Sequence, residues 1–351
     1  RRFSSRQRPE ARFPMDTVFS PAQRDEKLLA PPGEPLPEQP HTGGTLQRST
    51  KLCGFLGTFG FALVWIPCLL PPLLVAFVGL LLRTCGCCGA TLLNRTTILV
   101  FAACCRIALW LSVWIRVEER GFGVVGERMG RSGRPCLVIA NHTSFFDILL
   151  LVALLPFSKV QRVKMLISYR LFALPLLGQL NRAMGHLAVR NSRKTDDDAT
   201  RAMFAESTGK ALAEFEEYVR GGGTGGWFPE GDVNAGNTHA VGLFKKGGFA
   251  PAVKIDVELW CVSFCGNAVT WHAKGLPGRP ARVGASIACL CDSTHALLRD
   301  EGLSVNSDVD ACLLLLANQA RAKVQDGVST FVSEGFVGHD PDAPNLWGGH
   351  L

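Results

Sequence analysis

The N-terminal third of the chain contains long apolar runs with almost no charge. The run from Phe55 to Leu82 is uncharged and longer than the about 20 residues that a helix needs to cross a bilayer. Pro67, Pro71 and Pro72 interrupt it, and each proline removes a helix hydrogen bond. The pattern therefore predicts either two half-length helices that form a re-entrant hairpin, or one sharply kinked span.

A second apolar run extends from Thr96 to about Ser112 and contains Arg106. A charge in the middle of a lone spanning helix is costly, so the sequence predicts a helix lying in the membrane interface with Arg106 reaching outward. Residues 51–112 are thus expected to form a membrane-associated helical segment. Residues 1–50 are rich in proline with little apolar periodicity, which predicts a disordered tail.

From residue 113 onward, strand-like and helix-like patterns alternate. Strands are predicted at 113–118, 135–140, 163–167, 185–189, 259–264 and 283–290. Helices are predicted at 145–155, from Asp197 or Asp198 to Val219, and at about 308–324. Such alternation indicates an α/β fold with a central mixed sheet flanked by helices, here one domain over 113–351.

Composition adds two constraints. The 37 Lys and Arg residues against 30 Asp and Glu give a net charge of +7, which suits an anionic partner such as a membrane surface or a phosphate. Basic residues do not alternate with aromatic ones, so no nucleic-acid partner is expected.

The 13 cysteines are an odd number and lie mostly in apolar runs, which favours reduced thiols. Cys85, Cys87 and Cys88 are either packing residues or a palmitoylation site.

The candidate chemistry directly follows the predicted strand 135–140, in the string NHTSFFD at 141–147. His142 and Asp147 are five residues apart, which on a regular helix separates them by about 140°. They can pair if His142 lies in the loop before the helix, with Thr143 or Ser144 as its N-cap. Asp147 would then accept the proton of one imidazole nitrogen, and the other nitrogen could take a proton from a substrate hydroxyl.

Two later strings supply further polar groups. FPEG at 228–231 contains Glu230 and Gly231, and FKKG at 244–247 contains Lys245 and Lys246. A Pro-Glu-Gly turn after a strand can direct backbone N–H groups and a carboxylate at one place. A lysine nearby offers charge to a phosphate.

The order of these strings resembles the glycerolipid acyltransferase superfamily, which includes the 1-acylglycerol-3-phosphate acyltransferases. NHTSFFD fits its NHxxxxD signature, and FPEG and FKKG are similar to its downstream elements. The resemblance implies that His142 is the general base and Asp147 its partner. The substrate-binding residues that it implies are Glu230, Gly231, Lys245 and Lys246.

The segment GHLAVR at 185–190 resembles the family's second block, whose arginine holds the phosphate of the acceptor. Arg190 is the favoured match, and Arg193 is the alternative because the spacing is one residue short. His186 is expected to be structural. Asp232 and Val233 follow FPEG where many members carry Thr and Arg, which leaves the acceptor open.

The resemblance implies an enzyme that uses acyl-CoA as co-substrate, with no metal and no bound cofactor, and a lysophospholipid acceptor in the bilayer. The favoured reaction converts 1-acylglycerol-3-phosphate to phosphatidate. Glycerol 3-phosphate or another lysophospholipid is the alternative acceptor, and a non-catalytic membrane lipid-binding protein is the alternative class. The expected location is the endoplasmic reticulum or another endomembrane with the catalytic face cytosolic, or else a plastid.

Overall fold

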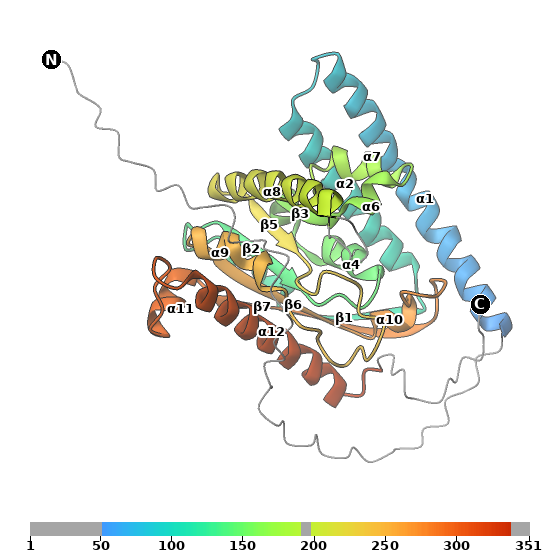
Figure 1. Ribbon diagram of the computed structural model, residues 1–351. Coiled ribbons are helices and arrows are strands. Elements are labelled where there is room, and N and C mark those ends of the chain that lie inside the picture. The colour runs from blue at the N-terminus through green and yellow to red at the C-terminus, as the bar shows by residue number, and fades with distance from the viewer. Residues whose placement is uncertain (1–50, 191–197, 338–351) are drawn as a thin grey trace. The chain divides into compact units, whose positions relative to one another are not determined.

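The structure is a computed structural model that describes residues 51–190 and 198–337, with side chains from 56 to 190 and from 202 to 337 (Figure 1). The predicted tail over 1–50 and Arg193 lie outside this part of the chain. The strands are β1 Ile115–Arg120, β2 Cys136–Ala140, β3 Val163–Ser168, β4 Leu187–Val189, β5 Thr224–Trp227, β6 Glu258–Cys265 and β7 Ala281–Cys291. The longer helices are α1 Lys51–Thr84, α2 Ala90–Leu111, α4 Phe146–Leu154, α8 Asp198–Arg220 and α12 Val309–Ser333. The shorter ones are α3 Phe122–Arg128, α5 Phe157–Val160, α6 Tyr169–Ala173, α7 Leu177–Ala183, η2 Lys246–Phe249, α9 Ala250–Lys254, α10 Asn267–Thr270 and α11 Thr294–Asp300.

The seven strands form one sheet in the order β1-β7-β6-β2-β5-β3-β4. Neighbouring strands run parallel except β6 and β7, which are antiparallel. The predicted α/β fold with a central mixed sheet is therefore confirmed. The central strands β2 and β6 are buried along their whole length, which explains their largely apolar sequences, typical of strands covered on both faces.

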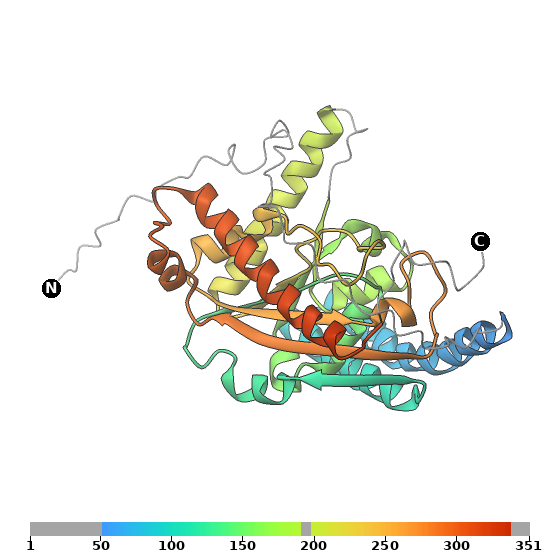
Figure 2. The same cartoon turned by 90° about the horizontal axis from the view of Figure 1, so that it is seen from below.

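Helices cover both faces of this sheet. On one face, α1, α2 and α4 pack in a cluster that includes Val138 of β2. On the other face, α8, α9 and α12 pack in a cluster that includes Leu137 and Ile139 of the same strand. Figure 2 shows α12 lying across the strands of its face. Alternate residues of β2 therefore anchor the two helical layers.

Strand β5 is a central strand that the apolar pattern does not reveal, because its sequence is Thr-Gly-Gly-Trp. A Cβ atom on Gly225 would lie 2.3 Å from the ring of Phe215, and one on Gly226 would lie 2.4 Å from the sulfur of Met165. Large side chains from α8 and β3 fill the space that strand side chains would otherwise occupy. The two glycines are required by packing against neighbouring elements.

Helix α1 is one continuous helix, so the predicted re-entrant hairpin is wrong (Figure 1). Pro67, Pro71 and Pro72 lie inside it. Trp65 before them and Ala76 after them are both buried in the core. Packing on both sides of the prolines holds the helical path where local hydrogen bonds are lost.

Arg106 points into the protein, which corrects the prediction that it reaches outward from α2. Its guanidinium donates hydrogen bonds to the carbonyl oxygens of Ala153 at 2.7 Å and Leu155 at 2.5 Å, and lies 3.7 Å from the ring centre of Phe157. These carbonyls belong to the C-terminal end of α4, where a helix has unpaired acceptors and favours a cation. The inner face of α2 packs against the α/β domain. Arg106 therefore supplies the cation at the C-terminal end of α4.

Candidate active site

The candidate site begins where β2 ends, in a central position of the sheet. Asn141 joins this end to β6 because its amide donates to the carbonyl of Phe264 at 2.9 Å and accepts from the N–H of Phe264 at 2.8 Å. Loops that leave the carboxyl ends of parallel strands are the usual place for ligands in α/β sheets. His142 is the next residue, on a loop whose start is fixed by two strands.

His142 and Asp147 form the pair that their spacing predicts. The Nδ1 atom of His142 lies 3.0 Å from Oδ2 of Asp147. The same carboxylate oxygen accepts hydrogen bonds from the backbone N–H groups of Thr143 at 2.8 Å and Ser144 at 3.0 Å. Asp147 is completely buried in the first turn of α4, with its Oδ2 directed at these two N–H groups.

The residue that caps the N-terminus of α4 differs from the predicted one. The helix begins at Phe146 with Phe145 as N-cap residue, and neither Thr143 nor Ser144 occupies that position. Ser144 instead uses its hydroxyl to accept from the N–H of Phe146 at 3.0 Å. The side chain of Asp147 reaches back to the loop N–H groups, so the carboxylate organises the loop as well as the imidazole.

The arrangement defines the tautomer that His142 needs as a base. A carboxylate facing Nδ1 accepts a hydrogen bond from Nδ1–H, which leaves the lone pair on Nε2 for a substrate. The ring of Phe228 stacks on the imidazole with centroids 4.2 Å apart and planes 18° apart. Phe228 belongs to the FPEG string, so this contact fixes the plane of the base.

Asn267 is a member of the site that sequence reasoning missed. It lies in α10, directly after β6, and is fully buried. Its amide donates to the second oxygen of Asp147, Oδ1, and to the hydroxyl of Thr143 at 2.9 Å. No pattern in the chain marks an asparagine 120 positions after its partner.

Glu230 holds the backbone of the catalytic loop. Its Oε1 accepts from the N–H of His142 at 2.7 Å, and its Oε2 accepts from the N–H of Gly242 at 3.0 Å. The carbonyl of His142 accepts from the N–H of Asn234 at 2.6 Å. Burial raises the pKa of Glu230, while the two backbone hydrogen bonds act in the opposite direction. Both carboxylate oxygens therefore accept backbone N–H groups of two loops, and the substrate contact that the resemblance implies for Glu230 stays a prediction.

Gly231 and Lys245 lie together at the FPEG turn. Gly231 has a φ of +80°, a conformation that favours glycine, and a Cβ there would lie 2.4 Å from the ammonium nitrogen of Lys245. That ammonium is 3.7 Å from the carboxylate of Asp232. Lys246 turns away and pairs with Asp310 of α12 at 3.2 Å. The structure thus separates two lysines that are adjacent in sequence.

Arg190 follows β4 and lies on an aromatic surface. The centre of its guanidinium is 4.5 Å from the ring centre of Tyr169 and 5.4 Å from that of Phe204. Its backbone is held by Thr208 of α8, with bonds of 3.0 and 2.9 Å. Stacking on rings holds the guanidinium plane while its edge can still bind an anion.

His186 has the structural role expected of it. Its Nδ1 accepts the N–H of Met165 at 3.2 Å, and burial lowers the pKa of His186 to about 3, so the ring is neutral. It joins β3 to the start of β4.

Residues 122–264 match the family model described as Acyltransferase. The match contains the whole His142 loop and the FPEG turn. In this segment the chain therefore matches the acyltransferase family. One relative of the chain, 1-acyl-sn-glycerol-3-phosphate acyltransferase BAT2, chloroplastic, of Brassica napus, is 28% identical over 163 residues, which are 45% of this chain and 41% of the relative.

A second relative of the chain is lysophosphatidylcholine acyltransferase 2 of Danio rerio, 29% identical over 162 residues, which are 44% of this chain and 27% of the relative. The matched region therefore spans less than half of either relative. The crystal structure of the 1-acyl-sn-glycerophosphate acyltransferase PlsC from Thermotoga maritima has the same fold, with a TM-score of 0.56 at 18% identity over 81% of this chain and 98% of that one.

Proposed function

We propose that the protein is an acyl-CoA-dependent glycerolipid acyltransferase that converts 1-acylglycerol-3-phosphate to phosphatidate, with acyl transfer carried out by residues 113–351. The observation that carries this proposal is the His142–Asp147 pair at 3.0 Å, held at the end of β2 within the segment that matches the family. A base with its orienting carboxylate is the arrangement that acyl transfer to a hydroxyl requires.

In the proposed reaction, Nε2 of His142 takes the proton of the acceptor hydroxyl as the oxygen attacks the thioester carbonyl of acyl-CoA. The tetrahedral intermediate collapses with loss of the CoA thiolate, which receives that proton from the imidazolium. Asp147 remains ionised throughout and stabilises the imidazolium. Glu230 and Asn267 keep the loop and the carboxylate in this geometry.

The acceptor phosphate is assigned to Arg190 and Lys245. A phosphate at neutral pH carries close to two charges, and a guanidinium can bind it with two parallel hydrogen bonds. Lys245 is preferred to Lys246 because it lies at the FPEG turn, whereas Lys246 pairs with Asp310. Glycerol 3-phosphate or another lysophospholipid is the alternative acceptor, since one relative is named for lysophosphatidylcholine.

The N-terminal helices support a bilayer as the place of reaction. By length and composition, α1 and α2 are apolar enough to cross a membrane. The exposed apolar side chains of α1 recur every three or four residues, at Leu56, Phe59, Leu63, Ile66, Leu70, Leu74, Phe77 and Leu81. We assign this outer face of α1 to lipid, with the endoplasmic reticulum or another endomembrane as the favoured location and a plastid as the alternative.

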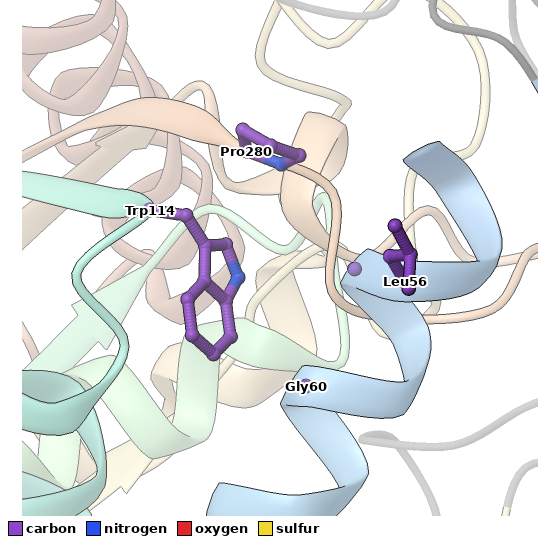
Figure 3. A pocket seen from close by; sticks show the side chains of 5 residues that line it. Leu56, Gly60, Trp114 and Pro280 are labelled. Atoms are coloured by element: carbon purple, nitrogen blue, oxygen red, sulfur yellow. The ribbon is translucent and has the colours of Figure 1, made fainter. Parts of the chain in front are cut away.

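An apolar cavity beside α1 suits an acyl chain. It has a volume of about 300 Å³ and is lined by Leu56, Gly57, Gly60, Trp114 and Pro280 (Figure 3). It contains none of the polar site residues. Phe61, next to its wall, contacts Phe146 with ring centroids 6.2 Å apart, and Phe146 precedes Asp147. An aromatic contact thus links α1, beside this pocket, to α4, which carries Asp147.

The deciding experiment is an assay of the purified full chain with labelled acyl-CoA against a panel of acceptors: 1-acylglycerol-3-phosphate, glycerol 3-phosphate and lysophosphatidylcholine. We expect the highest kcat/KM with the first, and a loss of roughly 10² to 10⁴ in turnover for His142→Ala. A folded His142→Ala protein that binds lipid and shows the same low activity as the unmodified chain would support the non-catalytic lipid-binding alternative.

A further inference from the structure

The turn between α6 and α7 exposes five consecutive apolar residues, Ala173-Leu174-Pro175-Leu176-Leu177. Leu174, Leu176 and Leu177 are 46%, 55% and 40% exposed. Exposing an apolar run of this length to water is unfavourable. Such a run on a protein surface therefore usually marks a binding site. The turn lies outside the catalytic loop, and the reaction described above does not use it.

The backbone of this turn is strained at Leu176. Its φ is +64° and its ψ is −56°, and it is the one residue other than glycine with positive φ in the described part of the chain. The N–H of Leu177 donates to the carbonyl of Pro175 at 2.7 Å, which makes a γ-turn of the rare, strained kind centred on Leu176. Such a conformation persists only where the surroundings impose it, and it tends to mark function.

Hydrogen bonds and close packing around the turn impose the strained conformation of Leu176. The N–H of Gly178 donates to the carbonyl of Leu174 at 2.8 Å, and a Cβ on Gly178 would lie 2.2 Å from the carbonyl oxygen of Phe172. Arg182 donates to that same oxygen at 3.2 Å. The fold therefore holds the leucines outward at the expense of backbone strain.

The turn leads into a helix that packs against α1. Helix α7 packs against α1, whose outer face carries the exposed apolar side chains assigned to lipid (Figure 1). Arg170 and Arg182 are exposed on either side of the turn. An apolar centre with cationic flanks is the pattern of a segment that lies in the interface of an anionic bilayer.

The turn is also joined to the proposed phosphate site. Helix α6 begins at Tyr169, whose ring lies 4.5 Å from the guanidinium centre of Arg190. Four residues separate that ring from the first exposed leucine of the turn. A lipid whose tail lies among the leucines would therefore have its headgroup on the side of Arg190.

We propose that residues 173–177 insert into the lipid bilayer as a second membrane contact, separate from α1, and that this contact brings the acceptor headgroup to Arg190. The second half of the proposal rests on the proposed function. The first half requires only a bilayer and can be tested without acyl transfer.

The direct test places a diazirine-bearing amino acid at position 176 of the full chain by stop-codon suppression, with position 337 as control. Val337 is an exposed apolar residue that follows α12, and α12 packs on the opposite face of the sheet from α7. The protein is reconstituted in vesicles of phosphatidylcholine and phosphatidylglycerol in equal parts and illuminated. We expect lipid adducts on the peptide containing position 176 and water adducts at position 337, by mass spectrometry. Water adducts at both positions would overturn the insertion.

The functional test uses Leu176→Gly, with Val337→Gly as matched control. Glycine adopts a φ of +64° without strain, so the melting temperature of Leu176→Gly should not fall. The KM for acceptor presented in vesicles should rise by about tenfold or more, the equilibrium equivalent of losing one buried leucine side chain. An unchanged KM would refute the link to the acceptor. Lipid adducts at position 176 in a protein without acyl transfer would refute the proposed function and leave the insertion standing.

Discussion

The backbone N–H of His142 donates a hydrogen bond to Oε1 of Glu230 across 2.7 Å and 88 positions of sequence. The second oxygen of the same carboxylate accepts from Gly242 at 3.0 Å. Glu230 therefore ties the loop that carries the base to the loop that follows FPEG. A residue in this position acts on the rate through the placement of His142.

Replacing Glu230 with Gln tests this positioning role. The amide has only one acceptor atom, so either His142 or Gly242 loses its hydrogen bond and faces an N–H donor. We expect kcat to fall by on the order of tenfold or more, as for other residues that hold a reacting group in place, with the acceptor KM nearly unchanged. Steady-state kinetics decide the matter, because a Glu230 that binds substrate would instead change KM at constant kcat.

Replacing Asp147 with Asn should cost far more than replacing its buried partner Asn267 with Ala. The amide that Asp147→Asn introduces can donate toward Nδ1, which reverses the tautomer of His142, and we expect turnover to fall by roughly 10² to 10⁴. Asn267→Ala removes one donor from a carboxylate that keeps two backbone N–H groups, so about a tenfold loss is expected. Equal losses in folded proteins would show that Asn267 is as important as the carboxylate itself.

Arg190→Ala should raise the KM for the acceptor much more than the KM for acyl-CoA, and Arg190→Lys should recover only part of the loss. The reason is that a lysine offers one point charge where a guanidinium offers two parallel hydrogen bonds. Arg193→Ala is the comparison that the spacing of the segment demands. If Arg193→Ala damages acceptor binding and Arg190→Ala does not, Arg193 is the phosphate ligand.

The adjacent lysines provide a matched pair of variants. Lys245→Ala should raise the acceptor KM because its ammonium lies at the FPEG turn. Lys246→Ala breaks an exposed ion pair with Asp310, which contributes about 0 to 1 kcal/mol to stability, and should leave the kinetics unchanged. The reverse result, with Lys246→Ala alone impairing acceptor binding, would contradict the assignment.

Because of the low pKa of His186, the free energy of unfolding should fall in mild acid. Burial lowers its pKa from 6.5 to about 3, so below pH 6.5 the unfolded chain binds a proton that the folded chain refuses. The free energy of unfolding should therefore decrease by about 1.4 kcal/mol per pH unit as the pH falls from 6.5 toward 3, in addition to other groups. His186→Asn, whose amide oxygen can accept from Met165, should show a shallower slope in denaturant titrations across this range.

Local sequence determined much of the fold and the heart of the site. Largely apolar runs marked β2 and β6 because parallel central strands are buried on both faces. The pairing of His142 with Asp147 was predictable from five residues of spacing, since a loop followed by one helical turn brings the two side chains together. Both inferences need only neighbours along the chain.

The tertiary structure decided what depends on segments far apart in sequence. The glycines of β5 form a strand because Phe215 and Met165 fill the space around them. Arg106 faces inward because the end of α4 offers it two carbonyl oxygens. Lys246 is separated from Lys245 by its contact with α12, and no local pattern contains that partner.

The same division holds for the catalytic loop. The sequence marked Glu230 through the FPEG string but did not mark Asn267, and it could not assign the partner of either residue. Glu230 lies 88 positions from His142, and Asn267 lies 120 positions from Asp147. They become neighbours only because the carboxyl ends of the adjacent strands β2, β5 and β6 lie side by side in the sheet. A hydrogen bond depends on distance and direction between two atoms, and for residues so far apart in sequence only the assembled fold sets them.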